Sequence, residues 1–199
     1  MSTLSTTNLK NPSSGSNNIV LAADGSATIT TLTGTTITGT SVRGGITSGT
    51  AVASTSGTSI DFTSIPSYVK RITVMLNGVS TSGTSVLQIQ IGTSGGVQTT
   101  GYLGSYGYGQ TPSSNLTTGF GIYNDAASDI LHGSSTLNLL NSSTGIWTFN
   151  SLLAWSSRAY QLPSAGSKTL SGTLDRVRIT TVSGTDTFDA GSINILYEG

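Results

Sequence analysis

The residues best suited to catalysis form two close pairs of aspartates, Asp125 with Asp129 and Asp186 with Asp189. A glycan-cleaving enzyme needs two carboxylates held about 5–10 Å apart across a sugar, so both pairs are candidates. However, Asn124-Asp125 and Asp186 have the character of turn residues, whose side chains accept hydrogen bonds from loop backbone. We favour this structural interpretation. The second pair also lacks the dense oxygen ligands of a known calcium-binding loop.

The only histidine is His132, and the chain contains no cysteine. A zinc site would therefore have to rest on carboxylates. A serine hydrolase would need His132 beside a nucleophilic serine, but no Gly-x-Ser-x-Gly elbow stands between a strand and a helix. From these residues we expect no catalytic site, no metal and no cofactor, so the chain is not expected to be an enzyme.

A segment rich in tyrosine and glycine, residues 101–109, is the best candidate for binding. It carries Tyr102, Tyr106 and Tyr108 among glycines and a serine. Tyrosine rings in such a loop offer a flat, amphipathic contact surface with little side-chain entropy to lose, as in antibody paratopes. These three residues are therefore candidates for receptor contact, including contact with sugars. The alternative interpretation, which we favour, is that the rings pack against a neighbouring subunit or the edge of the fold.

The elements that must position these residues are predicted to be strands. Charged residues make up 8% of the 199 residues, against about 25% in typical globular chains, and the net charge is zero. Such a chain has no excess of basic residues with which to bind nucleic acid or an anionic membrane. It also lacks an apolar run of the about 20 residues that a membrane span needs, and its N-terminus does not resemble a secretory signal.

Alternation of apolar and polar residues, which is typical of half-buried strands, recurs through the second half of the chain. No window has the spacing of an amphipathic helix. We therefore predict an all-β fold, an antiparallel β-sandwich of two sheets with a jelly-roll-like topology. The predicted strands lie within 69–79, 86–91, 117–123, 136–141, 145–155, 174–182 and 192–198.

A different pattern precedes the sandwich. Leu32, Ile37 and Val42 are each five residues apart, with Gly-Thr pairs between them. One small apolar side chain per five residues gives a lone chain almost no core, while ordering each residue costs about 1–2 kcal/mol. Several copies wound around one axis could stack these three side chains into a shared seam. We predict a stalk of this kind, with a flexible Thr/Ser/Gly linker as the alternative.

The chain therefore divides into three predicted parts. Residues 1–18 form a polar N-terminal arm with a turn-rich Asn11-Pro12 segment, residues 19–56 form the extended repeat stalk, and residues 57–199 form the β-sandwich head domain. The repeat makes self-association the first expectation, and its five-residue step fits spirals of more than one number of chains.

Two runs of sequence resemble a module of tailed-bacteriophage appendage proteins, especially those of marine and environmental phages. The first run is Ile60–Ser80, and the second consists of Leu174–Thr180 and Phe188–Glu198. Residues 11–15 and 19–25 are similar to the N-terminal segments of the same proteins. The resemblance covers most of the chain. It implies a virion structural protein, usually trimeric, with a stalk and a β-sandwich tip, of the kind often labelled tail fibre. It implies no catalytic residues.

The function expected from this resemblance is attachment to a host surface by a trimeric tail fibre or spike. Its partners would be copies of itself, a tail adaptor or capsid protein bound through residues 1–18, and a glycan or protein of the host surface. The protein would assemble in the host cytoplasm and be exposed on the particle. A capsid decoration protein or head fibre is the alternative, and a glycan depolymerase or a bacterial adhesin is more remote.

Overall fold

The structure, a computed structural model, describes residues 8–9, 13, 15, 19–21, 27–29, 45–109 and 114–199. The chain divides into two compact units, Met1–Arg43 and Gly44–Gly199. In the first unit, β1 (Asn8–Leu9), β2 (Ile19–Leu21) and β3 (Ala27–Ile29) form a three-stranded antiparallel sheet in that order. The predicted seam residues Leu32, Ile37 and Val42 lie outside the described residues.

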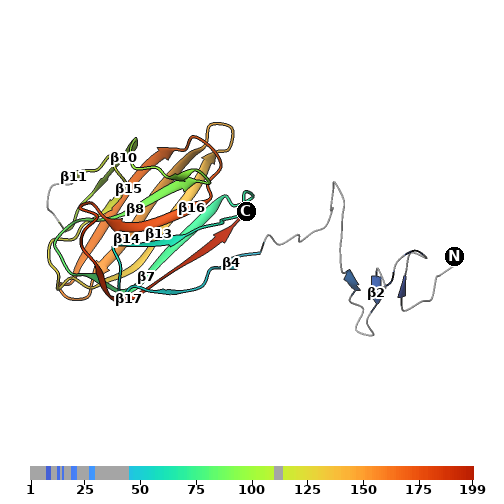
Figure 1. The fold of residues 1–199 in the computed structure, drawn as a ribbon, viewed down its shortest axis with the longest axis horizontal. Helices are drawn as coiled ribbons and strands as arrows, with labels where there is room; N and C mark the ends of the chain where they lie inside the picture. The colour runs from blue at the N-terminus through green and yellow to red at the C-terminus, as the bar shows by residue number, and fades with distance from the viewer. Residues whose placement is uncertain are drawn as a thin grey trace. The chain divides into compact units, whose positions relative to one another are not determined.

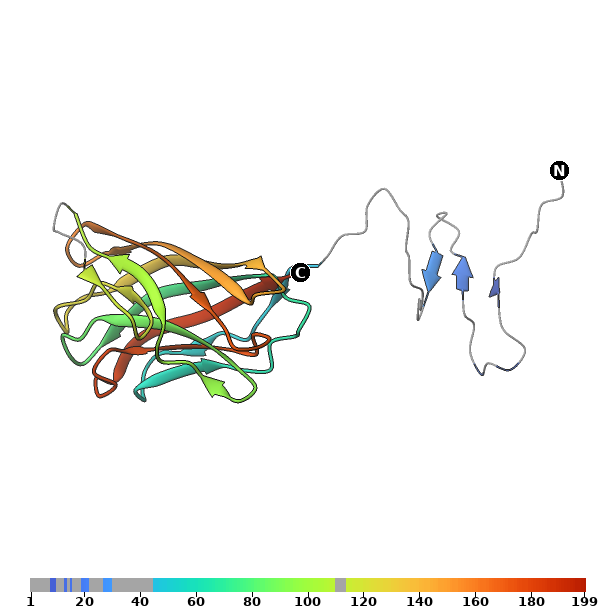
Figure 2. The ribbon, with the colours of Figure 1, turned by 90° about the horizontal axis from the view of Figure 1, so that it is seen from above.

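The second unit consists of two antiparallel sheets, which face one another as two layers (Figures 1 and 2). The larger sheet follows the order β11-β10-β15-β14-β13-β7-β17-β4, and β5 also pairs with β17. Its strands are β4 (Thr47–Ser48), β5 (Val52–Ala53), β7 (Arg71–Thr81), β10 (Tyr102–Tyr106), β11 (Ser114–Asn115), β13 (Leu131–Asn141), β14 (Ile146–Trp155), β15 (Tyr160–Thr169) and β17 (Phe188–Glu198).

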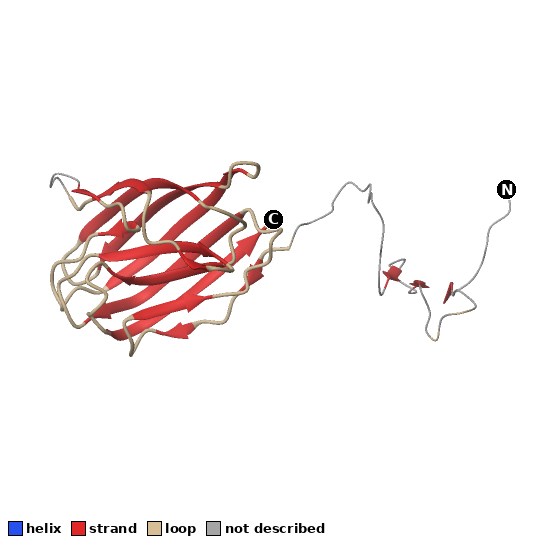
Figure 3. Ribbon diagram, turned by 45° about the horizontal axis from the view of Figure 1, so that its top comes forward, coloured by secondary structure: helices blue, strands red, loops and turns tan. Residues whose placement is uncertain are grey.

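The smaller sheet follows the order β12-β8-β16-β6, and β9 pairs with β8. Its strands are β6 (Ser59–Phe62), β8 (Leu87–Thr93), β9 (Gly96–Val97), β12 (Phe120–Ile122) and β16 (Arg176–Thr181). Among the described residues there is no helix (Figure 3). The prediction of an all-β fold built from two antiparallel sheets is therefore confirmed.

Alternating side chains explain why these segments are strands. In β7, Ile72, Val74 and Leu76 are buried, while the residues between them are exposed or partly exposed. In β14 the buried set includes Trp147 and Trp155. Since alternate residues of a strand point to opposite faces, each sheet turns one apolar face inward. The core lies between the two layers.

Strand β8 departs from the expected pattern. Gln88 and Gln90, which alternation places on a solvent face, are buried. Their amides are satisfied by the segment that precedes β12, because Gln90 Nε2 donates to Thr118 O at 2.8 Å and Thr118 Oγ1 donates to Gln88 Oε1 at 2.9 Å. A loop therefore covers the outer side of β8, and the buried amides are paired as burial requires.

The strand registers define two ends of the sandwich. We call one of them the proximal end. Strand β7 begins there and β17 finishes there, with Arg71 opposite Glu198, and the chain enters the sandwich at the same place through residue 45. Loops 63–70, 142–145 and 170–175 lie there. The opposite, distal end carries loops 82–86, 123–130, 156–159 and 182–187.

The sandwich unit includes residues that were predicted to belong to the stalk. Strands β4 and β5, within 47–53, both pair with β17 of the larger sheet. Ser54 is fully buried, and its hydroxyl donates to Ala190 O at 2.7 Å. The compact unit therefore extends back to Gly44.

Candidate functional site

Tyr102 is part of the core and not of a binding loop. It lies at the start of β10, is fully buried and packs edge-on against Phe120, with ring centroids 4.9 Å apart. Its hydroxyl accepts a hydrogen bond from Ile91 N at 2.8 Å and donates to Gln98 O at 2.8 Å. Burial raises the pKa of this phenol. The prediction that 101–109 is a loop is therefore wrong for 102–106, and Tyr102 cannot contact a receptor.

Tyr108, by contrast, lies at the centre of an aromatic cluster near the distal end. Its ring centroid is 4.4 Å from that of Tyr123, 5.3 Å from that of Trp155 and 5.6 Å from that of Tyr160. Tyr106 joins the same group, 6.3 Å from Tyr123. Trp155 is buried, whereas the tyrosines of the group are partly or largely exposed. The cluster therefore has a fixed base and an accessible outer surface.

A charged group borders these rings. The guanidinium of Arg158 lies over the Trp155 ring, with Cζ 4.0 Å from the centroid. Its Nε donates to Asp129 Oδ1 at 2.7 Å, and Nη2 binds both Asp129 and Asp125. These carboxylates raise the pKa of the Arg158 guanidinium. Asp129 is fully buried, whereas about a third of each of the Arg158 and Asp125 side chains is accessible.

We define the distal cluster as Tyr106, Tyr108, Tyr123, Asp125, Asp129, Trp155, Arg158 and Tyr160. Tyr160 is its most exposed ring, at 47%. Aromatic faces can pack against sugar rings. Beside them, the guanidinium can donate hydrogen bonds to the hydroxyl groups of a sugar, and the carboxylate can accept hydrogen bonds from these groups. The distal cluster is therefore suited to binding a sugar. Its members come from three separate segments of chain, so no spacing in the sequence indicates the cluster.

The other polar candidates have structural partners. Asp186 Oδ2 accepts from Ser85 N at 2.9 Å, and Asp189 accepts from the Ser80 hydroxyl. His132, which lies on β13, accepts at Nδ1 from Gly78 N at 3.2 Å. Within the part of the chain that the structure describes, no three acidic or histidine side chains are grouped as metal ligands.

Part of the outer face of the larger sheet, away from the Arg71–Glu198 ion pair, carries no exposed charge. Over the four adjacent strands β10, β15, β14 and β13 the single charged residue is Lys168, which is buried. Leu103, Leu140 and Leu152 are exposed there. The outer face of the smaller sheet differs, since it carries the ion pair between Arg178 and Asp61. We call the face of β10, β15, β14 and β13 the uncharged face.

Comparisons of this chain with protein-family models, with curated proteins and with solved structures found no match. Among the described residues, no helix is long and apolar enough to span a membrane.

Proposed function

We propose that this chain is a virion structural protein, a trimeric phage tail fibre or spike whose sandwich binds the host surface. The sequence resemblance supports the assignment to a virion. The two resembling runs, Ile60–Ser80 and Leu174–Thr180 with Phe188–Glu198, also form one structural block. Strand β6 pairs with β16 in the smaller sheet, and β7 pairs with β17 in the larger one.

The order of the strands supports the finer assignment to a jelly roll. In one sheet β4 and β5 pair with β17, which is followed by β7 and β13; in the other, the order is β6, β16, β8 and β12. Early and late strands of the chain thus alternate in both sheets, as in a double-sheet jelly roll. In this proposal β10, β14 and β15 are additions that widen the larger sheet.

The uncharged face supports self-association. Four strands about 4.8 Å apart and up to about ten residues long, at about 3.3 Å per residue, span at most roughly 600 Å², which approaches the about 800 Å² that each partner buries in a standard interface. In a trimer each copy would meet its neighbours around a three-fold axis, and contact through this face would leave no charge buried without a partner. Together with a seam of Leu32, Ile37 and Val42 in the stalk, this face would hold the chains together.

The single observation that carries the attachment function is the position of the distal cluster. It lies at the end of the sandwich opposite the point where residue 45 enters, so a chain anchored through residues 1–18 would present it outward. Tyr106 and Tyr108 remain contact candidates, and Tyr160 with Arg158 and Asp125 joins them. Several copies of a weak site on one particle would give avidity.

The experiment that tests this function is binding of the fluorescently labelled full chain to a panel of bacterial cells and of purified bacterial surface polysaccharides. The proposal expects saturable binding to a subset of the panel. Binding to none of the cells, or equal binding to all of them, would contradict a role in specific attachment.

A capsid decoration protein or head fibre remains the second candidate, because the same fold and the same self-association would serve it. In that case residues 1–18 would lie along the shell. A glycan depolymerase is less favoured, since Asp129 is held by Arg158, and Asp186 and Asp189 by serines. Carboxylates tied in this way are poorly placed to act as a general acid and base.

A further inference from the structure

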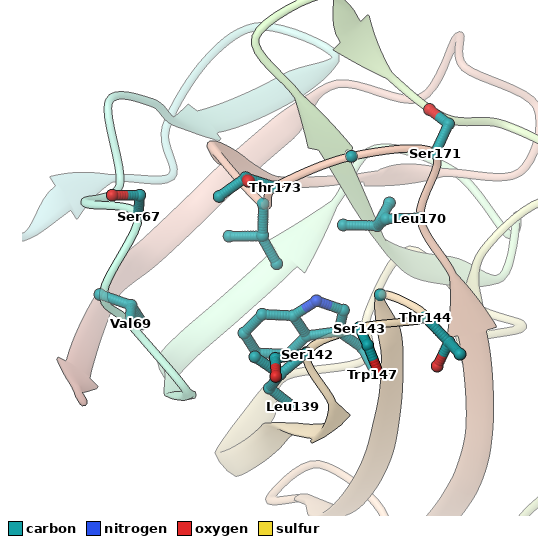
Figure 4. A pocket seen from close by; sticks show the side chains of 13 residues that line it. Ser67, Val69, Leu139, Ser142, Ser143, Thr144, Trp147, Leu170, Ser171 and Thr173 are labelled. Atoms are coloured by element: carbon teal, nitrogen blue, oxygen red, sulfur yellow. The ribbon is translucent and has the colours of Figure 1, made fainter.

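A pocket of about 440 Å³ opens at the proximal end of the sandwich, between the 142–145 turn, the 170–174 loop and the segment at Ser67 and Val69 (Figure 4). Its size falls within the range of small-molecule sites. It lies at the opposite end of the unit from the distal cluster, and no residue of that cluster lines it.

The base of the pocket is apolar and contains one unpaired polar group. Trp147 is only 2% exposed, and Leu139, Leu170 and Leu174 line the same pocket. Its indole nitrogen lies on the side of the ring that faces the 170–174 loop (Figure 4). Among the described residues, no hydrogen-bond acceptor pairs with this N–H. Since most polar groups in protein interiors have a partner, a donor left unpaired in the lining of a pocket is available to a ligand.

The rim of the pocket consists of neutral hydroxyl groups. The side chains of Ser67, Ser142, Thr144 and Thr173 line it and form no hydrogen bond to another described residue. Among the residues that the structure describes, no charged side chain lines the pocket. A charged ligand would therefore lose its hydration without gaining a counter-charge.

The walls of the pocket are held in place by other contacts. Asn141 Oδ1 accepts hydrogen bonds from Ser143 N at 2.9 Å and from Thr144 N at 3.3 Å, which fixes the 142–145 turn. Leu170 N donates to Gly145 O at 3.0 Å, and Gln98 Nε2 donates to Ser171 Oγ at 2.6 Å. The pocket is therefore formed before any ligand enters, which lowers the entropic cost of binding.

We propose that this pocket binds a neutral monosaccharide unit. A sugar ring offers hydroxyl groups to the rim, an acceptor oxygen to the Trp147 N–H and apolar C–H groups to the leucines. A ligand of about twelve heavy atoms with ordinary ligand efficiency would bind with a Kd on the order of 1 mM. This inference does not rest on the proposed attachment function, because it concerns a different end of the sandwich and different residues.

The test is a titration of the ¹⁵N-labelled full chain with single neutral sugars: glucose, galactose, mannose, rhamnose, fucose and N-acetylglucosamine. The indole N–H signal of Trp147, assigned by Trp147→Phe, is followed up to about 20 mM sugar. At least one sugar is expected to shift it in a saturable manner. The indole signal of Trp155, at the distal end, is followed in the same spectra, so that a sugar bound at the distal cluster is distinguished from one bound in the pocket. Glucuronic acid and glycerol serve as charged and non-ring probes and should have no effect.

Two variants complete the test. Gly172→Leu adds a side chain to a residue that lines the pocket, and the added Cβ would make an ordinary van der Waals contact with Thr93 Cγ2 at 3.6 Å. It should weaken binding at least tenfold, whereas Ser56→Leu, at an exposed loop position outside the pocket, should not. The inference is overturned if no neutral sugar moves the Trp147 signal, if glycerol or glucuronic acid moves it equally, or if Gly172→Leu binds as the unmodified chain does.

Discussion

The guanidinium of Arg158 lies 4.0 Å from the centroid of the Trp155 ring while its Nε donates to the buried Asp129 at 2.7 Å. One side chain thus joins the aromatic and the acidic halves of the distal cluster. A cation above an indole ring is attracted to it, and a buried carboxylate requires a partner. The loops 123–130 and 156–159 are therefore tied together at the proposed contact surface.

Removal of Arg158 should destabilise the fold. The Arg158→Ala variant leaves the Asp129 carboxylate buried, with only hydrogen bonds from the backbone N–H groups of Asp125 and Ala126. Loss of one partner of a buried pair costs about 3 kcal/mol. Urea unfolding followed by tryptophan fluorescence measures this change in the free energy of unfolding.

The matched control is the exposed pair of Arg178 and Asp61, which is also held by two hydrogen bonds. Arg178→Ala should cost no more than about 1 kcal/mol. Changing Asp129 to Asn in the Arg158→Ala chain removes the unpaired charge and should restore part of the stability. Equal losses for Arg158→Ala and Arg178→Ala would show that burial of Asp129 has no energetic consequence.

Tyr102 should make the fold sensitive to alkali. Burial raises the pKa of its phenol above the ordinary value of about 10, so above that pH the unfolded chain loses a proton that the folded chain keeps. The free energy of unfolding must then fall as pH rises through about 10. Tyr102→Phe removes this contribution. It should also cost about 1–3 kcal/mol at pH 8, because Ile91 N–H loses its acceptor.

The ionisation of Tyr102 and the loss of its hydrogen bond can be separated by comparing the parent chain with Tyr102→Phe at several pH values. The difference in the free energy of unfolding between the parent chain and Tyr102→Phe should shrink as pH rises from about 9 to 11. Lys168, whose pKa is lowered by burial, is present in both chains, so its contribution largely cancels. A difference that stays constant over this range would mean that Tyr102 ionises equally in the folded and unfolded chains.

Tyr160 should contribute to host contact more than any other exposed tyrosine. Its ring is nearly half exposed at the edge of the distal cluster. On a surface that the parent chain binds, Tyr160→Ala should weaken binding about tenfold, which corresponds to about 1.4 kcal/mol. Tyr160→Phe should retain most of it. Tyr68→Ala, which removes an exposed tyrosine at the proximal end, is the control and should bind normally; a loss equal to that of Tyr160→Ala would place the contact elsewhere.

Strands with large apolar side chains on one face can be predicted from the sequence, as in β7 and β14. Strand β15 escapes such a prediction because its inward positions include Ser164, Gly166 and Lys168, which hide the alternation. A packing requirement explains the glycine there: a Cβ on Gly166 would lie 2.5 Å from Leu103 O. Such a requirement comes from the neighbouring strand and leaves no local pattern.

The functional candidates are less predictable. The segment 101–109 is recognisably unusual in composition, but its residues divide between the core and the distal cluster according to which side of β10 each one occupies. Arg158 and Tyr160 give no signal, because their roles depend on Asp129 and Tyr108, which are far away in sequence. The uncharged face is likewise recognisable only when β10, β15, β14 and β13 are placed side by side.

The most direct test of the proposed assembly is whether the uncharged faces of different copies meet. The chain has no cysteine, so a single Leu152→Cys, at a position 58% exposed on β14, can be treated with a short bifunctional thiol crosslinker in the full chain. The proposed assembly predicts efficient crosslinking between chains at this position and little at Val182→Cys, an exposed position outside the uncharged face. If Leu152→Cys crosslinks no better than Val182→Cys, the faces do not meet and the proposed assembly is wrong.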